Sequence, residues 1–443
     1  MLATQKYKNK RIAIYGMGLT GRSAAKTLKN LGAKIFCWDD NIKIRKKIKK
    51  LNLFTEKFWL NKNSFDNIVI SPGIDSNKCK IKKYLKKNSN KIITDLDLFF
   101  NLNKNNIIIS ITGTNGKSTT CKIIEKILKT ANITVQTVGN IGNPILSSKK
   151  IKKKCVFILE ISSYQLQYSK LFRSKHAAIL NISPDHLDRH KTIKNYTKIK
   201  SRIFFAQNSS DYSYINSENK YSKNIKKIFK DKKLKSKLFL INKSKYNFLI
   251  KKISNKYFQS KGNIENIVFA YKIAKNLKIK DKIIIKGINS FKGLPHRQEI
   301  IFSNKKLLCI NDSKATSFEA CIQSLSNYKQ IYWIVGGLPK YHDSFYLRKV
   351  KDRITKAYII GKNCLFFKKK VGKMIPFSIS YNMKNALNNI YKDLKLNNNS
   401  KQTILLSPAA ASFDQFKNFE NRGKYFRNLI LRKFKKSKNV KSR

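Results

Sequence analysis

The stretch Ile107-Ile-Ile-Ser-Ile-Thr-Gly-Thr-Asn-Gly-Lys-Ser-Thr-Thr120 decides the fold class of this chain. Its opening run, from Ile107 to Ile111, is almost entirely β-branched and predicts a buried strand. Two glycines then turn the backbone where a side chain would keep a ligand away. The following residues predict a helix with one apolar face, formed by Ile123, Ile124, Ile127 and Leu128. Strand, glycine turn and helix together indicate an α/β domain built on a parallel sheet.

This turn is typical of a site that binds the phosphates of a nucleoside triphosphate. Backbone N–H groups and the helix N-terminus face the anion, Lys117 reaches the outer phosphates, and the Ser118 hydroxyl ligates Mg²⁺. The common spacing of such loops places a glycine at position 111, where this chain has isoleucine. The loop therefore departs from the common phosphate-binding pattern and matches a more restricted variant, Thr-Gly-Thr-Asn-Gly-Lys-Ser-Thr. The residues predicted to line it are Gly113, Thr114, Asn115, Gly116, Lys117, Ser118 and Thr119.

Composition sets limits on the remainder of the chain. Its 443 residues predict two to four domains, and its 41% hydrophobic content is that of a folded protein. The net charge of +71 suggests nucleic acid as a partner. The lysines, however, crowd stretches such as 149–154 and 433–443, whereas residues 404–416 and 178–190 contain no lysine. We therefore interpret the charge as a solvated surface and expect no nucleic-acid partner.

Cysteine spacing and hydropathy point to a cytoplasmic protein. The seven cysteines form no Cys-x-x-Cys pair, which argues against a disulfide framework and against a structural zinc site. No signal-like apolar segment opens the chain, and no stretch approaches the length that a membrane span needs. We expect no membrane insertion and a monomeric protein.

The first hundred residues predict a dinucleotide-type fold. A strand runs into Gly16-x-Gly18-x-x-Gly21, and a second strand ends in Asp39 and Asp40, where such folds keep a ribose-binding acid. This pattern alone favours a nicotinamide-dependent dehydrogenase. A further turn, Ser71-Pro-Gly-Ile74, lets backbone approach a ligand, so a nucleotide without redox function fits equally well.

The middle of the chain carries the candidate metal ligands. Glu160 ends the apolar strand that starts at Val156, which is a usual position for a Mg²⁺ ligand. The stretch from Ala178 to His190 ends another strand in an acidic loop that contains two of the five histidines. We select His186 for the metal site and expect His190 at a helix start or on the surface. Lys200 follows on a predicted helix.

The last third alternates strands and helices. Before it, residues 211–260 predict only a variable loop-and-strand region, and the Gly/Pro turn at 291–299 predicts a hinge. Three loops then follow strands, at 311–316, 336–343 and 407–416. Because strand ends of a parallel sheet share one edge, we expect these loops to line one mouth.

Taken together, these motifs resemble the Mur ligase family of peptidoglycan synthesis. The Thr-Gly-Thr-Asn-Gly-Lys-Ser-Thr loop, Asp185-His186, Leu294-Pro-His-Arg297 and Asn311-Asp-Ser-Lys-Ala-Thr316 occur in the family's order. The stretch from Leu406 to Gly423 resembles the branch of the family that adds D-glutamate. The resemblance covers nearly the whole chain, apart from residues 211–260.

The resemblance implies three domains with distinct tasks. A Rossmann-like domain over 1–97 would hold the UDP-sugar, a P-loop-type ATPase domain over 98–297 would hold ATP, and a Rossmann-like domain over 298–443 would hold D-glutamate. The implied activity is an ATP-dependent ligation of D-glutamate to UDP-N-acetylmuramoyl-L-alanine through an acyl phosphate. ATP and two Mg²⁺ ions are the implied cofactors.

The resemblance also implies a role for individual residues. The UDP-substrate would contact Leu19, Thr20, Asp39, Asp40, Gly73 and Asn140. Beyond the glycine-rich loop, the ATP contacts would be Asn266, Arg297 and Asp312. The metal ligands would be Ser118, Glu160, His186 and a carbamylated Lys200. Lys117, His186 and Lys200 would be catalytic, His186 acting either as a metal ligand or as a base. D-glutamate would contact Thr316, Lys340, Ser412 and Phe419, unless Ser412 only caps a helix starting at Phe413.

Three other functions share parts of the pattern. A folylpolyglutamate synthetase-like ligase has the same ATP loop, but it does not require the motif at 407–416. A dehydrogenase explains only the first forty residues. A basic nucleic-acid-binding ATPase explains the charge and the loop and leaves the other motifs unexplained. Phosphate release that depends on D-glutamate and on the UDP-linked acceptor distinguishes the Mur ligase hypothesis from all three.

Overall fold

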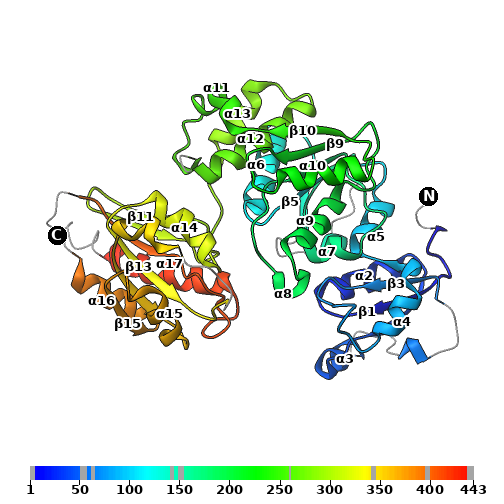
Figure 1. Cartoon of the computed structure of the whole chain (residues 1–443), viewed down its shortest axis with the longest axis horizontal. Coiled ribbons are helices and arrows are strands. Elements are labelled where there is room, and N and C mark those ends of the chain that lie inside the picture. Colours follow the sequence, from blue (N-terminus) through cyan, green and yellow to red (C-terminus); the bar gives the residue numbers. More distant parts are fainter. Residues whose placement is uncertain are drawn as a thin grey trace. The chain divides into compact units, whose positions relative to one another are not determined.

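The computed structural model describes residues 5–49, 57–60, 65–139, 144–147, 154–258, 261–340, 346–394 and 400–436. The chain divides into two compact units, Met1–Phe291 and Lys292–Arg443. The first unit contains two sheets, and the second contains one (Figure 1). The α/β class is confirmed, while the domain boundaries at 97 and 297 stay a prediction. Among the described residues, no helix has the length and hydropathy to cross a membrane.

The N-terminal sheet is parallel and has the strand order β2-β1-β3-β4. Its strands are β1 (Arg11–Tyr15), β2 (Lys34–Trp38), β3 (Asn67–Ile70) and β4 (Ile92–Ile93). Its helices are α2 (Leu19–Asn30), α3 (Ile42–Lys49), α4 (Lys82–Lys87) and α5 (Asp95–Leu102). A Cβ atom on Gly21 would lie 2.0 Å from the Gly16 carbonyl oxygen, so glycine lets α2 start close behind β1.

The central sheet is also parallel and has the order β10-β9-β8-β5-β7-β6. Its strands are β5 (Ile107–Thr112), β6 (Val135–Gly139), β7 (Val156–Glu160), β8 (His176–Ile179), β9 (Tyr212–Asn216) and β10 (Lys237–Ile241). The predicted glycine-rich loop follows β5, which lies between β7 and β8. The Lys-rich region at 211–260 supplies the two strands at one end of this sheet.

Helix α6 (Lys117–Thr130) of the central domain buries the apolar face that the sequence predicts, and seven further helices of this domain lie among the described residues. They are α7 (Ser163–Tyr168), α8 (Leu187–His190), α9 (Ile193–Ser201), α10 (Ser222–Asp231), α11 (Asn247–Ile250), α12 (Lys261–Asn276) and α13 (Asp281–Asn289). α6 packs against α12 and α13. A Cβ on Gly287 would lie 2.8 Å from the Ile127 Cα, so a glycine in α13 allows close contact with α6.

The second unit, yellow to red in Figure 1, contains a six-stranded sheet of order β11-β12-β16-β13-β14-β15. Its strands are β11 (Glu299–Ser303), β12 (Leu307–Asn311), β13 (Ile331–Gly336), β14 (Ile354–Ile360), β15 (Phe377–Tyr381) and β16 (Gln402–Leu406). Only β11 runs antiparallel to its neighbour. The helices are α14 (Phe318–Asn327), α15 (Cys364–Val371), α16 (Met383–Asp393) and α17 (Phe419–Lys436). Sequence analysis missed β11 and β15, which carry no glycine-rich or acidic motif.

Candidate active site

Three neighbouring strands of the central sheet bring the predicted catalytic loops to one edge. The glycine-rich loop follows β5, Glu160 ends β7, and the loop that contains His186 follows β8. The first and third loops are joined directly. The Thr114 N–H donates to the Asn181 carbonyl over 3.0 Å, and the Asn115 N–H donates to the Asn181 side-chain oxygen over 2.9 Å. These contacts hold both loops in register.

The glycine-rich loop requires glycine at its two turns. Gly113 has φ 153° and Gly116 has φ 85°, values that L-residues rarely adopt. A Cβ on Gly116 would lie 2.3 Å from the Asn266 side-chain oxygen. The Thr120 hydroxyl donates to that same oxygen over 3.1 Å. Asn266 on α12 therefore lies against the start of α6, next to the buried Ser118 and Thr119.

Two lysines converge on one backbone carbonyl of this loop. The Nζ atoms of Lys117 and Lys200 each donate to the Gly113 carbonyl over 2.9 Å. Lys117 also donates to the Thr114 carbonyl over 2.8 Å, and Lys200 lies 3.3 Å from the Thr112 hydroxyl. Lys200 is only 1% exposed. Burial, reinforced by the charge of Lys117, lowers the pKa of Lys200 well below its ordinary value.

His186 is held between an acid and a phenol. Its Nε2 lies 3.3 Å from Asp185 Oδ2, and its Nδ1 lies 3.0 Å from the Tyr164 hydroxyl. The backbone of His186 adopts φ 54°, which turns the chain into α8. The ring is thus oriented at one nitrogen by Asp185 of its own loop and at the other by Tyr164 of α7.

The residues at this edge fit a magnesium ion. Glu160, at the end of β7, is 2% exposed and Ser118, in the first turn of α6, is 3% exposed, so a carboxylate and a hydroxyl lie buried at this edge. No group of three or more His, Cys, Asp or Glu that could hold a metal occurs among the described residues. That finding is compatible with Mg²⁺, which takes one or two carboxylates and completes its shell with substrate phosphates and water. A cationic Lys200 does not fit this donor set.

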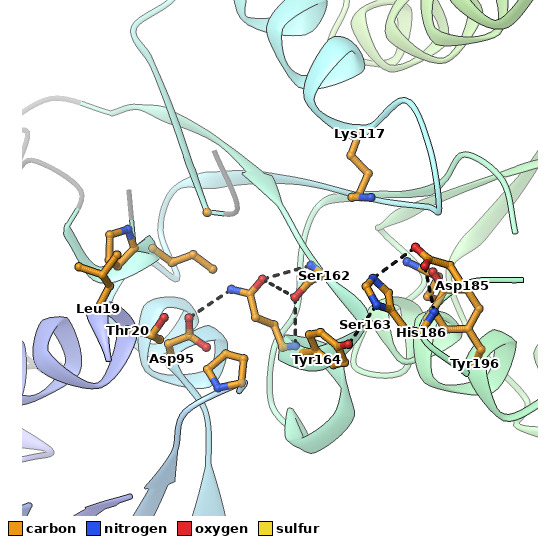
Figure 2. Close-up of a pocket in the computed structure, with 16 residues that line it drawn as sticks. Leu19, Thr20, Asp95, Lys117, Ser162, Ser163, Tyr164, Asp185, His186 and Tyr196 are labelled. Carbon is orange, nitrogen blue, oxygen red and sulfur yellow. Dashed lines mark hydrogen bonds and ion pairs between the residues drawn. The ribbon is translucent and has the colours of Figure 1, made fainter. Parts of the chain in front are cut away.

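A cavity of about 460 Å³ connects these loops to the N-terminal domain. Leu19 and Thr20 lie at one end, and Asp185, His186 and Tyr196 lie at the other (Figure 2). Lys117 and Lys200 also line it. The structure therefore brings part of the predicted UDP-substrate set together with the predicted catalytic set.

Three other predicted UDP contacts, Asp39, Asp40 and Gly73, lie outside this lining. The Asp39 carboxylate accepts the Met17 and Asn41 N–H groups over 2.7 and 2.8 Å, and Asp40 accepts the Tyr15 hydroxyl over 2.6 Å. A Cβ on Gly73 would meet no atom within 4 Å. The fourth residue, Asn140, lies outside the described residues. The substrate roles of all these residues stay predictions.

The three predicted loops of the second unit do share one sheet edge. β12 and β13 both pair with β16. The Asp312 N–H donates to the Leu406 carbonyl over 2.8 Å, and the Gly336 N–H donates to the Pro408 carbonyl over 2.9 Å. The prediction that these loops begin at one edge of the same sheet is thereby confirmed. Burial raises the pKa of Asp312 to about 6, against hydrogen bonds from Ser324 and Ser407 that lower it.

The predicted D-glutamate residues differ in exposure. Lys340 is exposed, whereas Ser412 is 2% exposed. The Ser412 hydroxyl makes no hydrogen bond with the described residues. The cap interpretation is wrong, because the next helix, α17, begins only at Phe419. Thr316 is partly buried in the loop after β12, and its substrate role, like that of Phe419, stays a prediction.

Sequence analysis missed a buried arginine in this loop cluster. Arg422 is 1% exposed and donates to the Ser313 carbonyl over 2.8 Å and to the Ala410 carbonyl over 3.0 Å. Its guanidinium therefore joins the loops after β12 and β16. Arg297, a predicted ATP contact, belongs to this unit too and lies close enough to Asp312 to lower its pKa. The available signal was Glu420-Asn-Arg-Gly423, at the end of the stretch from Leu406 to Gly423.

His190 is neither on the surface nor at a helix start, contrary to both predicted alternatives, because it is buried and ends α8. It is 1% exposed, and its ring packs beside Tyr164 and Tyr196 at centroid distances of 5.6 and 5.4 Å. Its Nε2 lies 2.9 Å from the hydroxyl of Ser163, which lines the cavity. Burial lowers the pKa of His190 to about 4, so the ring is neutral. The other lining residues that went unpredicted include Asp95, Ser162, Tyr164 and Gln165.

Comparisons with known proteins agree with this geometry. The family model described as the Mur ligase middle domain matches residues 111–285. The UDP-N-acetylmuramoylalanine–D-glutamate ligase of Rickettsia prowazekii (strain Madrid E) is 36% identical and covers 96% of this chain and 99% of its own. The enzyme of that name from Rickettsia felis is 35% identical, with coverages of 96% and 98%.

A solved structure supports the fold. The MurF ligase from Thermotoga maritima, in complex with ADP, superposes with a TM-score of 0.58 at 14% identity and covers 98% of each chain. The sequence relatives match nearly end to end at more than 30% identity. The chain therefore belongs to the Mur ligase family, among the UDP-N-acetylmuramoylalanine–D-glutamate ligases.

Proposed function

We propose that this chain is an ATP-dependent ligase that joins D-glutamate to UDP-N-acetylmuramoyl-L-alanine in the synthesis of peptidoglycan precursors. One observation carries the proposal beyond family membership. A single cavity runs from Leu19 and Thr20 of the N-terminal domain to Lys117 of the phosphate loop and to Lys200. A substrate with a nucleotide at one end and a reacting carboxylate at the other needs a cavity of this kind.

The first step transfers a phosphoryl group. An oxygen of the alanyl carboxylate attacks the γ-phosphorus of ATP, an acyl phosphate forms, and ADP leaves. Loop N–H groups and the α6 N-terminus face the phosphates. The Lys117 ammonium, held by two loop carbonyls, is placed to follow the charge on the migrating group. Asn266 would contact adenine, Arg297 the phosphates and Asp312 the ribose.

The second step forms the amide bond. The D-glutamate nitrogen attacks the acyl carbon, a C–N bond forms, and phosphate leaves. The nitrogen also loses a proton. The His186 imidazole, aligned by Asp185 and Tyr164, either accepts this proton or serves as a metal ligand, because one nitrogen lone pair does not do both.

Magnesium would be held by Ser118, Glu160, His186 and a carbamate of Lys200, with two ions as the family implies. When bound there, the metal neutralises charge on the phosphoryl oxygens. Lys200 favours the carbamate for two reasons. Its lowered pKa increases the fraction of neutral amine, which can attack CO₂ with loss of a proton, and the adjacent Lys117 charge would stabilise the resulting anion.

D-glutamate would bind in the second unit. Lys340 offers a cation for one carboxylate, Thr316 and Ser412 offer hydroxyl donors, and Phe419 offers a wall and a backbone N–H. The buried Ser412 hydroxyl, which has no hydrogen bond among the described residues, supports this choice.

The deciding experiment measures phosphate release by the purified full-length protein. Release is expected only when ATP, Mg²⁺, D-glutamate and UDP-N-acetylmuramoyl-L-alanine are all present. Replacing the acceptor by a folate, or D-glutamate by L-glutamate, should abolish it. Release stimulated by nucleic acid without the acceptor would contradict the proposal.

A further inference from the structure

Arg189 links two loops that line opposite parts of the substrate cavity. It lies on α8, one turn after His186, and its side chain is only 9% exposed. Its Nη2 donates to the carbonyl oxygen of Ile74 in the N-terminal domain. Its Nε lies 3.9 Å from a carboxylate oxygen of Asp75. A central-domain guanidinium therefore holds the turn that follows β3.

Tyr168 holds the same turn from α7. Its hydroxyl accepts the Ser76 N–H over 2.9 Å and the Arg189 Nη2 over 3.0 Å, and donates to the Ile74 carbonyl over 3.3 Å. The turn follows Pro72, which lines the cavity, and Gly73, a predicted UDP contact. Moving residues 74–76 would therefore move the wall on which the UDP-substrate rests.

The other side of the guanidinium reaches the catalytic loop. It stacks over the Tyr164 ring at 5.4 Å, and the Tyr164 hydroxyl lies 3.0 Å from His186 Nδ1. The Nε of Arg189 also donates to Gln167 over 3.0 Å. A continuous series of contacts thus runs from the turn at 74–76, through Arg189 and Tyr164, to His186.

We propose that Arg189 is a positioning residue that sets the affinity for the UDP-linked substrate by holding the turn at 74–76 against the loop that contains His186. The proposal rests on the proposed function. Arginine suits this task because a planar guanidinium can donate to a carbonyl and stack on a ring at once. A lysine would keep the charge and lose the second donor and the stacking face.

The test is steady-state kinetics of the full-length protein with each substrate varied in turn. We expect Arg189→Lys to raise the KM for UDP-N-acetylmuramoyl-L-alanine at least ~10-fold, while the KM values for ATP and D-glutamate change less than ~2-fold. The dissociation constant of the UDP-linked substrate, measured by calorimetry without ATP, should rise in parallel. Arg173→Lys is the matched control.

Arg173 also pairs its guanidinium with a carboxylate, because its Nε and Nη2 lie 2.7 and 3.2 Å from the Asp211 oxygens. It has no contact with the turn at 74–76. Its variant should therefore leave all three KM values unchanged, whatever it does to the melting temperature. Tyr168→Phe, which removes the second contact to the turn, should raise the same KM as Arg189→Lys.

A double-mutant cycle completes the test. Because both side chains hold one turn, their effects should not be independent. The combined Arg189→Lys/Tyr168→Phe variant should lose less binding free energy for the UDP-linked substrate than the two single variants lose together. Equal rises in all three KM values, or a lower melting temperature with unchanged KM values, would overturn the role of Arg189. A wild-type protein that releases no phosphate with the full substrate set would instead overturn the proposed function.

Discussion

The central sheet and the sheet of the second unit place their loops alike and their charges differently. Each presents three loops at the carboxyl ends of neighbouring parallel strands, after β8, β5 and β7 in one and after β12, β16 and β13 in the other. In the central sheet, Lys200 and Glu160 lie buried at 1% and 2% exposure. In the second, Lys340 is exposed, and Asp312 is buried beneath the hydroxyls of Ser324 and Ser407.

This difference separates a region suited to chemistry from one suited to recognition. Burial removes water from a charge, so it shifts pKa values and strengthens every electrostatic contact. The central edge buries the Lys200 amine that we propose to be carbamylated. The second edge ties its loops together through buried hydrogen bonds, and its exposed Lys340 is the proposed contact for D-glutamate.

The largest expected effect is at the central edge. Lys117→Ala removes the charge that follows the migrating phosphoryl group, and we expect kcat to fall at least ~10³-fold with the fold intact. ADP production measures the effect, and circular dichroism checks the fold. A variant with near-normal ADP production would show that this edge does not perform phosphoryl transfer.

Lys200→Ala tests the proposal that the buried Lys200 is carbamylated and binds the metal. We expect activity close to background, about 10²-fold or more below wild type, because an oxygen ligand of the metal is lost. Short carboxylic acids added to the assay should restore part of the activity. The matched control is Lys198→Ala, since Lys198 lies on the same helix but is exposed, and it should retain full activity. Full activity of Lys200→Ala would refute the role of the carbamate.

Lys340→Ala tests the recognition role of the second edge. The KM for D-glutamate should rise at least ~10-fold, about 1.4 kcal/mol, while the KM for ATP stays nearly unchanged. Lys349→Ala, which removes another exposed lysine of the same unit, should leave both values unchanged. If L-glutamate serves as well as the D-isomer, the amino-acid pocket lies on other residues.

The last prediction concerns folding stability and not catalysis, and it tests the buried acid of the second unit. The pKa of Asp312 in the folded state, about 6, lies above its ordinary value of 3.8. The folded state therefore binds the proton more tightly than the unfolded state. The stability that protonation of Asp312 contributes is complete below pH 4 and is lost as pH rises to 6. Asp312→Asn should flatten the pH dependence of the unfolding free energy by about 1–3 kcal/mol across this window. The unfolding free energy of each protein is measured by denaturant titration at several pH values. The same pH dependence in the wild type and in the variant would contradict the prediction.

Much of the site was readable because local patterns and strand ends constrain each other. The strand, glycine turn and helix from Ile107 to Leu128 appear in the structure as predicted, since the chain needs positive φ at Gly113 and Gly116. Glu160 was predicted at a strand end and lies there. Such features depend on residues close in sequence, which the printed chain shows directly.

The misses share a different cause. His190 is buried by Tyr164 and Tyr196, and Arg422 is buried by loops near Ser313 and Ala410, so each environment is assembled from distant segments. Composition gave no help with Lys200. Lysine is so frequent in this chain that residue type alone does not distinguish this buried lysine from its exposed neighbours. The resemblance to the family, and no local pattern, selected it.

The amino-acid sequence alone determined the α/β class, the phosphate loop and the family, because hydrophobic periodicity, obligatory glycines and motif order are properties of the linear chain. The burial, the charged neighbours and therefore the pKa of each titratable group were decided by tertiary packing. Lys117 and Lys200 meet at one carbonyl, and Arg189 meets Ile74, only because strand order and helix packing bring distant segments together. Burial and neighbouring charge, which set pKa and reactivity, exist only after those segments have met.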